Sequence, residues 1–477
     1  MHVRRNVRTL TDPDPWPDAL VWYARAVGEL RGRSEADPED PTGWAYMAAI
    51  HGRRGEPGGR GARFNQCQHM TWYFLPWHRI YLHYFEAVVR EAIVGLGGPG
   101  DWALPYWDYS EPDSQATRTL PEAFRERQMT DGSENPLFTE HRADSVNGGG
   151  GLPRSTVDVV KALGSFRFTN SLGGLRPEFG GRKTDWAHFG TGPFGLVESL
   201  PHNDVHVKVG DKDGGWMRDP SLAALDPIFW LHHANIDRLW EVWRSLGEGR
   251  ADPTDAAWRD EPFAVGRGAS AVDLTPGDVV DTTAAPLRYR YDSVAVPAAV
   301  RDRLPSPPAA PPPFAMAEDP DRPAEMVGAT EAPFSLTSGQ TSASVRTEPP
   351  TGPAAFGMAG DSDAGEVLLQ VENVTGPEPV STVFDVFVNL PEGADPREFR
   401  DREAGRVALF GLAEATEPDG AHGGSGLTFG FDITEVARRL REAGDWDPDR
   451  VRVTFVPDEE GGTDADVTVG RVSVHRA

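Results

Sequence analysis

The sequence predicts a mainly α-helical first domain, in which four helices form a bundle, followed by a smaller all-β domain built as a sandwich. Three observations lead to this fold class: apolar residues recur at helical spacing in the first half of the chain, a proline-rich segment follows, and short alternating runs come after it. A chain of 477 residues also exceeds the usual size of one hydrophobic core. We place the first domain at residues 1–295, a linker at 296–324 and the second domain at 325–477.

Two helices of the first domain are expected to turn a histidine inward. His51 follows Trp44 and Met47 at helical spacing, so the three side chains share one face. The run from His78 to Leu96 carries its apolar residues on the face of the histidine, namely Leu82, Phe85, Val89 and Ile93. Both histidines therefore point into the predicted core.

Two further helical segments bring three more histidines inward. Asp226 and Pro227 form a typical helix start, with the carboxylate as N-cap and proline in the first turn. The helix that follows carries His233 on the same face as Ile236, Trp240 and Trp243. His202 and His206 are four residues apart, so a helical turn would stack both rings on one side. The four helices thus predict a bundle around a buried polar centre.

Two triads of histidines predict a metal centre, and they are His51, His69 and His78, then His202, His206 and His233. A single buried histidine is more often a hydrogen-bonded core residue. Several neutral imidazoles cannot satisfy one another in a dry core, whereas metal ions bind the ring nitrogens. Imidazole suits copper, while magnesium and calcium prefer oxygen ligands, so a pair of copper ions is expected. His232 points about a quarter-turn away from His233 and is expected to be structural or to support a ligand without binding the metal.

The linker and the second domain differ from the first in composition. From about Val296 to Glu325 proline and alanine dominate, which is typical of an extended linker. One helix is expected over residues 433–443. Alternating runs rich in β-branched residues predict antiparallel strands over residues 342–346, 367–371, 383–390, 407–410, 451–456 and 467–474.

Charge and cysteine content exclude several classes of partner and location. A net charge of −26 argues against nucleic acid or an anionic membrane, because both would repel this chain. We see no apolar stretch that would span a bilayer and no secretory signal at the start, so a cytoplasmic location is expected. A single cysteine excludes an internal disulfide.

Two segments resemble a known family. His69–Glu86 is similar to the first copper signature of the tyrosinase, catechol oxidase and haemocyanin family, and Asp226–Asp237 resembles the second. The resemblance implies a dinuclear type-3 copper centre with dioxygen as co-substrate. It also implies that one copper is held by His51, His69 and His78, and the other by His202, His206 and His233.

The same resemblance implies a catalytic pair and a feature of the pocket entrance. Glu198 looks like the glutamate that orients a water near the second copper in plant polyphenol oxidases, and Asn203 follows the first histidine of the second triad. This combination is associated with tyrosinase activity, since a monophenol with a pKa of about 10 must lose its proton to bind copper. The alternative is that both side chains only hydrogen-bond the turn at Pro201. Pro220 stands where plant enzymes place a phenylalanine over the first copper, which suggests a more open entrance.

Two further pairs near the ligands are expected. Cys67 and His69 are similar to the Cys-x-His of fungal tyrosinases and molluscan haemocyanins, which implies a thioether between them. The alternative is an ordinary buried thiol. Arg79 and Asp237 are expected to pair, either to orient the ligands or as a structural salt bridge.

The ends of both domains carry the resemblance as well. Leu287–Tyr291 resembles the Tyr-x-Tyr sequence that closes the catalytic domain of the family, with Arg4 or Arg5 as its partner. Val383–Asn389 is similar to the sequence that marks the carboxy-terminal domain of plant enzymes. The resemblance therefore covers nearly the whole chain.

These features together predict an oxidase of small phenols. We expect oxidation of o-diphenols to o-quinones and hydroxylation of monophenols, in a latent enzyme whose carboxy-terminal domain covers the site until a protease cuts the linker within residues 305–325. Phe399 is one candidate for the side chain that fills the pocket. The alternatives are an o-aminophenol oxidase, an oxygen carrier similar to haemocyanin, and a carboxy-terminal domain that escorts copper or a partner protein.

Overall fold

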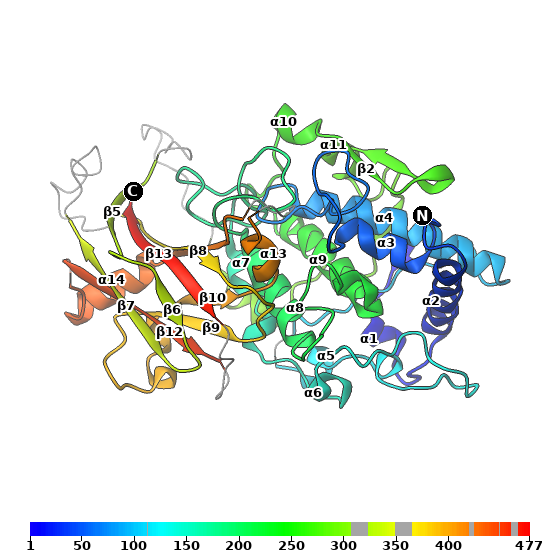
Figure 1. Ribbon diagram of the computed structural model, residues 1–477, viewed down its shortest axis with the longest axis horizontal. Coiled ribbons are helices and arrows are strands. Elements are labelled where there is room, and N and C mark those ends of the chain that lie inside the picture. Colours follow the sequence, from blue (N-terminus) through cyan, green and yellow to red (C-terminus); the bar gives the residue numbers. More distant parts are fainter. Residues whose placement is uncertain (112, 307–322, 349–364, 419–423, 448, 459–465) are drawn as a thin grey trace.

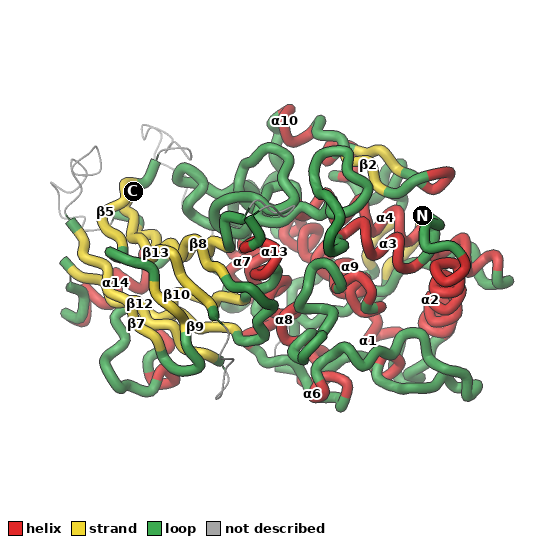
Figure 2. Tube along the Cα trace, in the orientation of Figure 1, coloured by secondary structure: helices red, strands yellow, loops and turns green. Residues whose placement is uncertain are grey.

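The helical and the β-rich halves of the chain are separate in space, as predicted (Figure 1). The tube view separates the helices of the first domain from the strands of the second (Figure 2). The computed structural model describes residues 1–111, 113–306, 323–348, 365–418, 424–447, 449–458 and 466–477.

Five helical segments build the core of the first domain. They are α2 (Asp18–Ala36), α3 (Trp44–His51), α4 (Phe74–Gly95), α9 (Pro227–Ser245), and a π-helical turn over Glu198–Asn203 that runs directly into α8 (Asp204–Val209). The predicted cap is present, since the Asp226 side chain accepts from the backbone N–H of Ile228 at 3.0 Å. Phe85 of α4 and Trp230 of α9 stack with ring centroids 3.5 Å apart, which joins the two longest ligand-bearing helices.

Shorter elements surround this core. The short helices are α1 (Val7–Leu10), α5 (Gln115–Arg118), α6 (Asp144–Asn147), α7 (Val160–Gly164), α10 (Ala256–Arg259), α11 (Pro276–Val279) and α12 (Ala298–Arg301). The first strand, β1 (His2–Arg4), lies parallel to β4 (Tyr289–Tyr291), and β2 (Phe263–Val265) pairs with β3 (Val272–Leu274). Among the described residues, none of the helices is both long and apolar enough to cross a bilayer.

The second domain is a β-sandwich whose strands are all antiparallel. Its strands are β5 (Glu325–Ala329), β6 (Phe334–Leu336), β7 (Thr341–Thr347), β8 (Val367–Thr375), β9 (Val383–Val388), β10 (Glu403–Ala408), β11 (Leu427–Asp432), β12 (Arg450–Pro457) and β13 (Val467–Arg476). They follow the order β10-β9-β12-β7-β5-β13-β8-β11, with β6 beside β13. The end strands approach each other where Gly405 faces the Phe431 ring, so the sheet encloses its own apolar core.

Two helices accompany the sheet, and the linker begins on the first domain. The predicted helix is present as α14 (Thr434–Ala443), and a short helix, α13 (Leu412–Thr416), lies between the sheet and the helical domain (Figure 1). In the segment expected to be a linker, Val300 of α12 is buried and Leu304 packs against the core of the first domain. Residues 307–322, which include most of the expected cleavage region, lie outside the described part of the chain.

Candidate metal centre

The histidines of both predicted triads converge in one buried space. His51 ends α3, His78 lies in the first turns of α4, His233 lies on α9, and the other second-triad members occupy the π-turn and α8. His69 comes from the loop before α4, where its backbone runs beside Phe189. All of these side chains are at most 2% exposed, namely His51, His69, His78, His202, His206 and His233.

In five of the six histidine rings, the Nδ1 atom is hydrogen-bonded to an oxygen of the protein. The Nδ1 atoms lie 2.7–3.0 Å from an oxygen acceptor in the pairs His51–Pro220 O, His69–Glu198 Oε1, His78–Phe74 O, His202–Asn203 Oδ1 and His206–Met217 O. Such a bond places the ring proton on Nδ1 and leaves the lone pair on Nε2. Each ring is therefore fixed in the tautomer that can bind a metal through Nε2.

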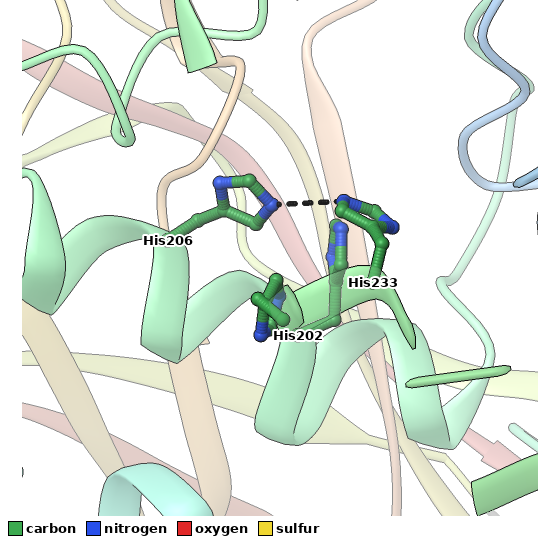
Figure 3. Close-up of side chains that lie close together, drawn as sticks. His202, His206 and His233 are labelled. Carbon is green, nitrogen blue, oxygen red and sulfur yellow. Dashed lines mark hydrogen bonds between the residues drawn. The ribbon is translucent and has the colours of Figure 1, made fainter. Parts of the chain in front are cut away.

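The opposite nitrogens meet around a common space. Among the described residues, the buried Nε2 atoms of His51, His69, His78 and His202 have no hydrogen-bond partner. The Nε2 atoms of His206 and His233 lie 3.3 Å apart (Figure 3). The rings of His78 and His233 stack at 4.4 Å, so the two triads face each other. Unsatisfied buried nitrogens are costly, and metal ions placed among them would remove that cost.

Burial also keeps these rings neutral. Desolvation lowers the pKa of His51 and of His202 to about 3, and it lowers the pKa of the other four ligand candidates well below the usual value. Metal binding requires an unprotonated ring nitrogen. The candidates are therefore ready to bind metal at neutral pH. An all-imidazole donor set fits copper, nickel, zinc or iron and does not fit magnesium or calcium.

Comparison with known proteins decides among these metals. Residues 41–246 match the model of the common central domain of tyrosinase, and residues 323–477 match a domain of unknown function. Tyrosinase HcTyr1 of Hahella sp. (strain CCB-MM4) is 36% identical over 502 aligned positions, which cover 100% of this chain and 99% of that protein. The chain belongs to the type-3 copper family of tyrosinases and polyphenol oxidases. It is a copper-dependent oxidoreductase of the tyrosinase type, and the family implies a dinuclear copper centre, which the paired histidine triads fit.

More distant relatives of this tyrosinase-family chain match part of it by sequence or the whole of it by fold. The latent form of polyphenol oxidase from Prunus armeniaca is 28% identical, with the match covering 58% of this chain and 47% of that protein. The solved structure of latent apple tyrosinase superposes with a TM-score of 0.66 at 23% identity and covers 100% of this chain and 97% of that one. At 23% identity, the similarity to latent apple tyrosinase shows a shared fold.

Glu198 and Asn203 both contact copper-ligand candidates in this tyrosinase-family site. Glu198 accepts from the Nδ1–H of His69 at 3.0 Å and from the backbone N–H of Met70 at 3.0 Å. Burial raises the pKa of Glu198 well above the ordinary value. Asn203 accepts from His202 Nδ1 at 2.9 Å, and its amide nitrogen is among the buried atoms of the described chain without a partner. The two side chains thus lie beside different triads.

Asp237 is the centre of a buried network beside the middle of α9. Arg79 and Arg4 both bind its carboxylate, and both lower the pKa of Asp237 although burial opposes them. The hydroxyls of Tyr289 and Tyr291 donate to the same carboxylate. Arg4 rather than Arg5 is therefore the partner of the Tyr-x-Tyr sequence, and the expected contact of Arg79 with Asp237 is present.

Cys67 and His232 make contacts that the sequence did not predict. The Cys67 sulfur lies 3.2 Å from Nδ1 of His188, and also near nitrogens of His51 and His69. His232, expected to be structural or to support a ligand, stacks on His202 at 5.4 Å and lies within reach of the second triad. Its Nδ1 is held by the Tyr109 hydroxyl at 3.0 Å. No spacing pattern marks His188 or Tyr109 in the sequence.

Phe410 of the second domain fills the mouth of the histidine site. Its ring stacks on His206 at 4.2 Å and lies 5.6 Å from His202 and 5.8 Å from His69. Phe399, the candidate from sequence, instead lies against Arg402 at 5.2 Å. Phe410 is the second residue after the end of β10, and only its placement between the domains sets it apart from other apolar residues. Sequence periodicity therefore could not identify it.

Pro220 contributes to the site through its backbone as well as its ring. Its carbonyl accepts from His51 Nδ1 at 2.8 Å. Its ring lies against Gly411, whose φ of +78° allows the chain to turn directly after Phe410. The entrance beside Pro220 is thus covered by the second domain.

Proposed function

We propose that this chain is a latent tyrosinase that oxidises o-diphenols to o-quinones with dioxygen and also hydroxylates monophenols. The observation that carries the proposal is the arrangement of six buried, neutral imidazoles, five of them oriented by a hydrogen bond at Nδ1, around a space that an aromatic side chain, Phe410, enters. A six-membered apolar ring in that space indicates that a phenol ring fits there. Two copper ions held by the triads would supply dioxygen binding and two-electron oxidation.

The protein side chains prepare the substrate for that chemistry. A phenol has a pKa of about 10, so a base must accept its proton before the oxygen can reach a metal. We assign this step to a water held between Glu198 and Asn203. The Glu198 carboxylate can accept a hydrogen bond from such a water, and the unpartnered Asn203 amide can donate one to it.

Latency is assigned to the second domain. Phe410 occupies the substrate space, and ion pairs across the interface hold the domain in place, including Arg406–Asp204 at 2.6 Å. Cleavage of the linker by a protease, or displacement of the domain, would open the site. A thioether between Cys67 and His69 is also proposed. Its formation replaces the S–H bond of Cys67 and one ring C–H bond of His69 with a C–S bond, and the two electrons and two protons released would go to dioxygen, giving hydrogen peroxide, in the copper-loaded protein.

Oxygen uptake by the copper-loaded chain tests the proposal. Catechol, tyramine and o-aminophenol are compared before and after limited proteolysis within residues 305–325. A latent tyrosinase gains activity on cleavage and oxidises catechol and tyramine. Oxidation of o-aminophenol alone would indicate an aminophenol oxidase, and reversible oxygen binding without turnover would indicate an oxygen carrier. Either result would contradict the proposal.

A further inference from the structure

Phe189 lies over a ligand of the first triad, in a position set by the first domain itself. Its ring centroid is 4.8 Å from that of His69, with the planes inclined by 34°. The backbone on either side is hydrogen-bonded to the same histidine, from His69 N–H to His188 O at 3.0 Å and from Gly190 N–H to His69 O at 2.8 Å. The ring therefore keeps its place beside His69 whether or not the second domain is docked.

The remaining neighbours of Phe189 belong mostly to the second domain. Together with Met70 and Phe194, it is part of the apolar cluster that forms the core of the β-sandwich. A Cβ atom on Gly411 would lie 2.8 Å from Cζ of Phe189, and Gly411 directly follows Phe410 in the chain. Phe189 thus borders the space that Phe410 fills. When the second domain leaves, this apolar ring faces the open site.

We propose that Phe189 is a specificity-determining residue that favours phenols and catechols with an uncharged apolar ring substituent. The inference rests on the proposed function, because the phenol ring must take the place of Phe410. A substituent that projects towards Phe189 buries apolar surface against an aromatic face, which is favourable. A charged substituent would lose water there without gaining a partner. Pro220 offers no aromatic surface to the substrate. Phe189, which lies on a different loop, therefore provides that surface.

The test compares two substrates on the same protein sample. The fraction of molecules in the open state affects both substrates equally, so it cancels from their ratio. Copper-loaded full-length chain carrying Arg406→Glu, which weakens the domain interface, is the common background. For the background alone and with Phe189→Ala or Phe194→Ala, we measure kcat/KM for 4-ethylcatechol relative to catechol. Binding of 4-ethylresorcinol relative to resorcinol is measured by calorimetry, because these meta-diphenols bind without direct conversion to an o-quinone.

Phe194 provides a matched control. It belongs to the same cluster and packs against Phe429 of the second domain at 5.2 Å, but within the described part of the chain its ring contacts none of the ligand histidines. We expect Phe189→Ala to lower both ratios about threefold to tenfold, through KM rather than kcat, as loss of contact with one or two carbon groups predicts. Phe194→Ala should leave both ratios unchanged.

Three results would overturn the inference. Unchanged ratios in Phe189→Ala would show that the ring does not contact the substituent, and equal losses in both variants would indicate a general effect of loosening the interface. A loss of copper in Phe189→Ala with unchanged resorcinol ratios would assign the residue a structural role. Absence of turnover and of binding with every compound in every variant would instead contradict the proposed function itself, and this inference with it.

Discussion

Replacement of Arg406 by methionine should release the second domain from the catalytic one. Arg406 lies on β10 and is bound by three carboxylates, with N–O distances of 2.6 Å to Asp204, 2.6 Å to Asp385 and 3.0 Å to Asp458. Asp204 belongs to the first domain and is 1% exposed. Burial raises the pKa of Asp204 to about 6 even though Arg406 lowers it, so the carboxylate depends strongly on this partner.

The size of the effect follows from that burial. Removing one partner of a buried ion pair costs about 3–5 kcal/mol, because a charge is left without compensation. If most of this cost falls on the docked state, the equilibrium between closed and open chains shifts by roughly 150-fold to 5,000-fold. Lys208, which binds Asp458 at 3.1 Å in the closed chain, lies one helical turn after Asp204 and can partly replace Arg406 once the domains separate. The open state therefore suffers less than the closed one.

Two measurements on the uncut chain check this prediction. Small-angle scattering should show an extended population for Arg406→Met, and catechol-dependent oxygen uptake should rise without proteolysis. Arg438→Met is the control, since within the described residues that arginine pairs with exposed glutamates of its own helix, α14, and we expect no change. Thermal unfolding separates undocking from loss of the β-sandwich. A variant that keeps both the compact scattering profile and the low activity would refute the reasoning.

Four further outcomes are expected. Burial and Asp219 raise the pKa of Glu414 to about 8, so the protonated form of Glu414 favours the closed chain. Docking of the second domain should be strongest below about pH 4.5 and weaken as the pH rises towards this raised pKa. In Glu414→Gln, small-angle scattering should no longer show this pH dependence. His78→Ala should lower the copper content from two ions to one per chain, measured by elemental analysis, with loss of the near-ultraviolet band that hydrogen peroxide produces. Tryptic peptides of copper-loaded protein should show a cross-link from Cys67 to His69 with a mass lower by about 2 Da, and a cross-link to another histidine would correct the assignment. Phe410→Ala should raise catechol turnover of the uncut chain without extending its scattering profile. Unchanged turnover would show that the Phe410 side chain does not block the site.

Local signals predicted the helices and the two triads well. Helical periodicity placed His78 and His233 on inward faces, and the Asp226–Pro227 start is present as expected, because caps and amphipathic faces depend on neighbouring residues only. Strands β5, β6 and β11 escaped prediction. The first two are five and three residues long, and β11 contains a glycine, so their runs are too short or too weak to stand out.

Contacts between distant segments were beyond sequence reasoning. Phe410, Phe189 and His188 reach the site only because the second domain and a long loop fold over the two triads. Their roles depend on distances across the chain rather than on spacing within it. The pairing of Arg79 with Asp237 was predicted because Arg79 directly follows His78 and Asp237 lies one helical turn after His233.

The parallel pairing of β1 with β4 has a consequence for the cut enzyme. The first residues of the chain and those just before the proline-rich segment meet side by side, and Asp292 further accepts from the backbone N–H of Asn6 at 3.1 Å. These contacts hold both ends of the first domain in place, and they lie before the linker in which cleavage is expected. The first domain of the cleaved protein should therefore keep its thermal stability, and it should not unfold locally from the new carboxy terminus.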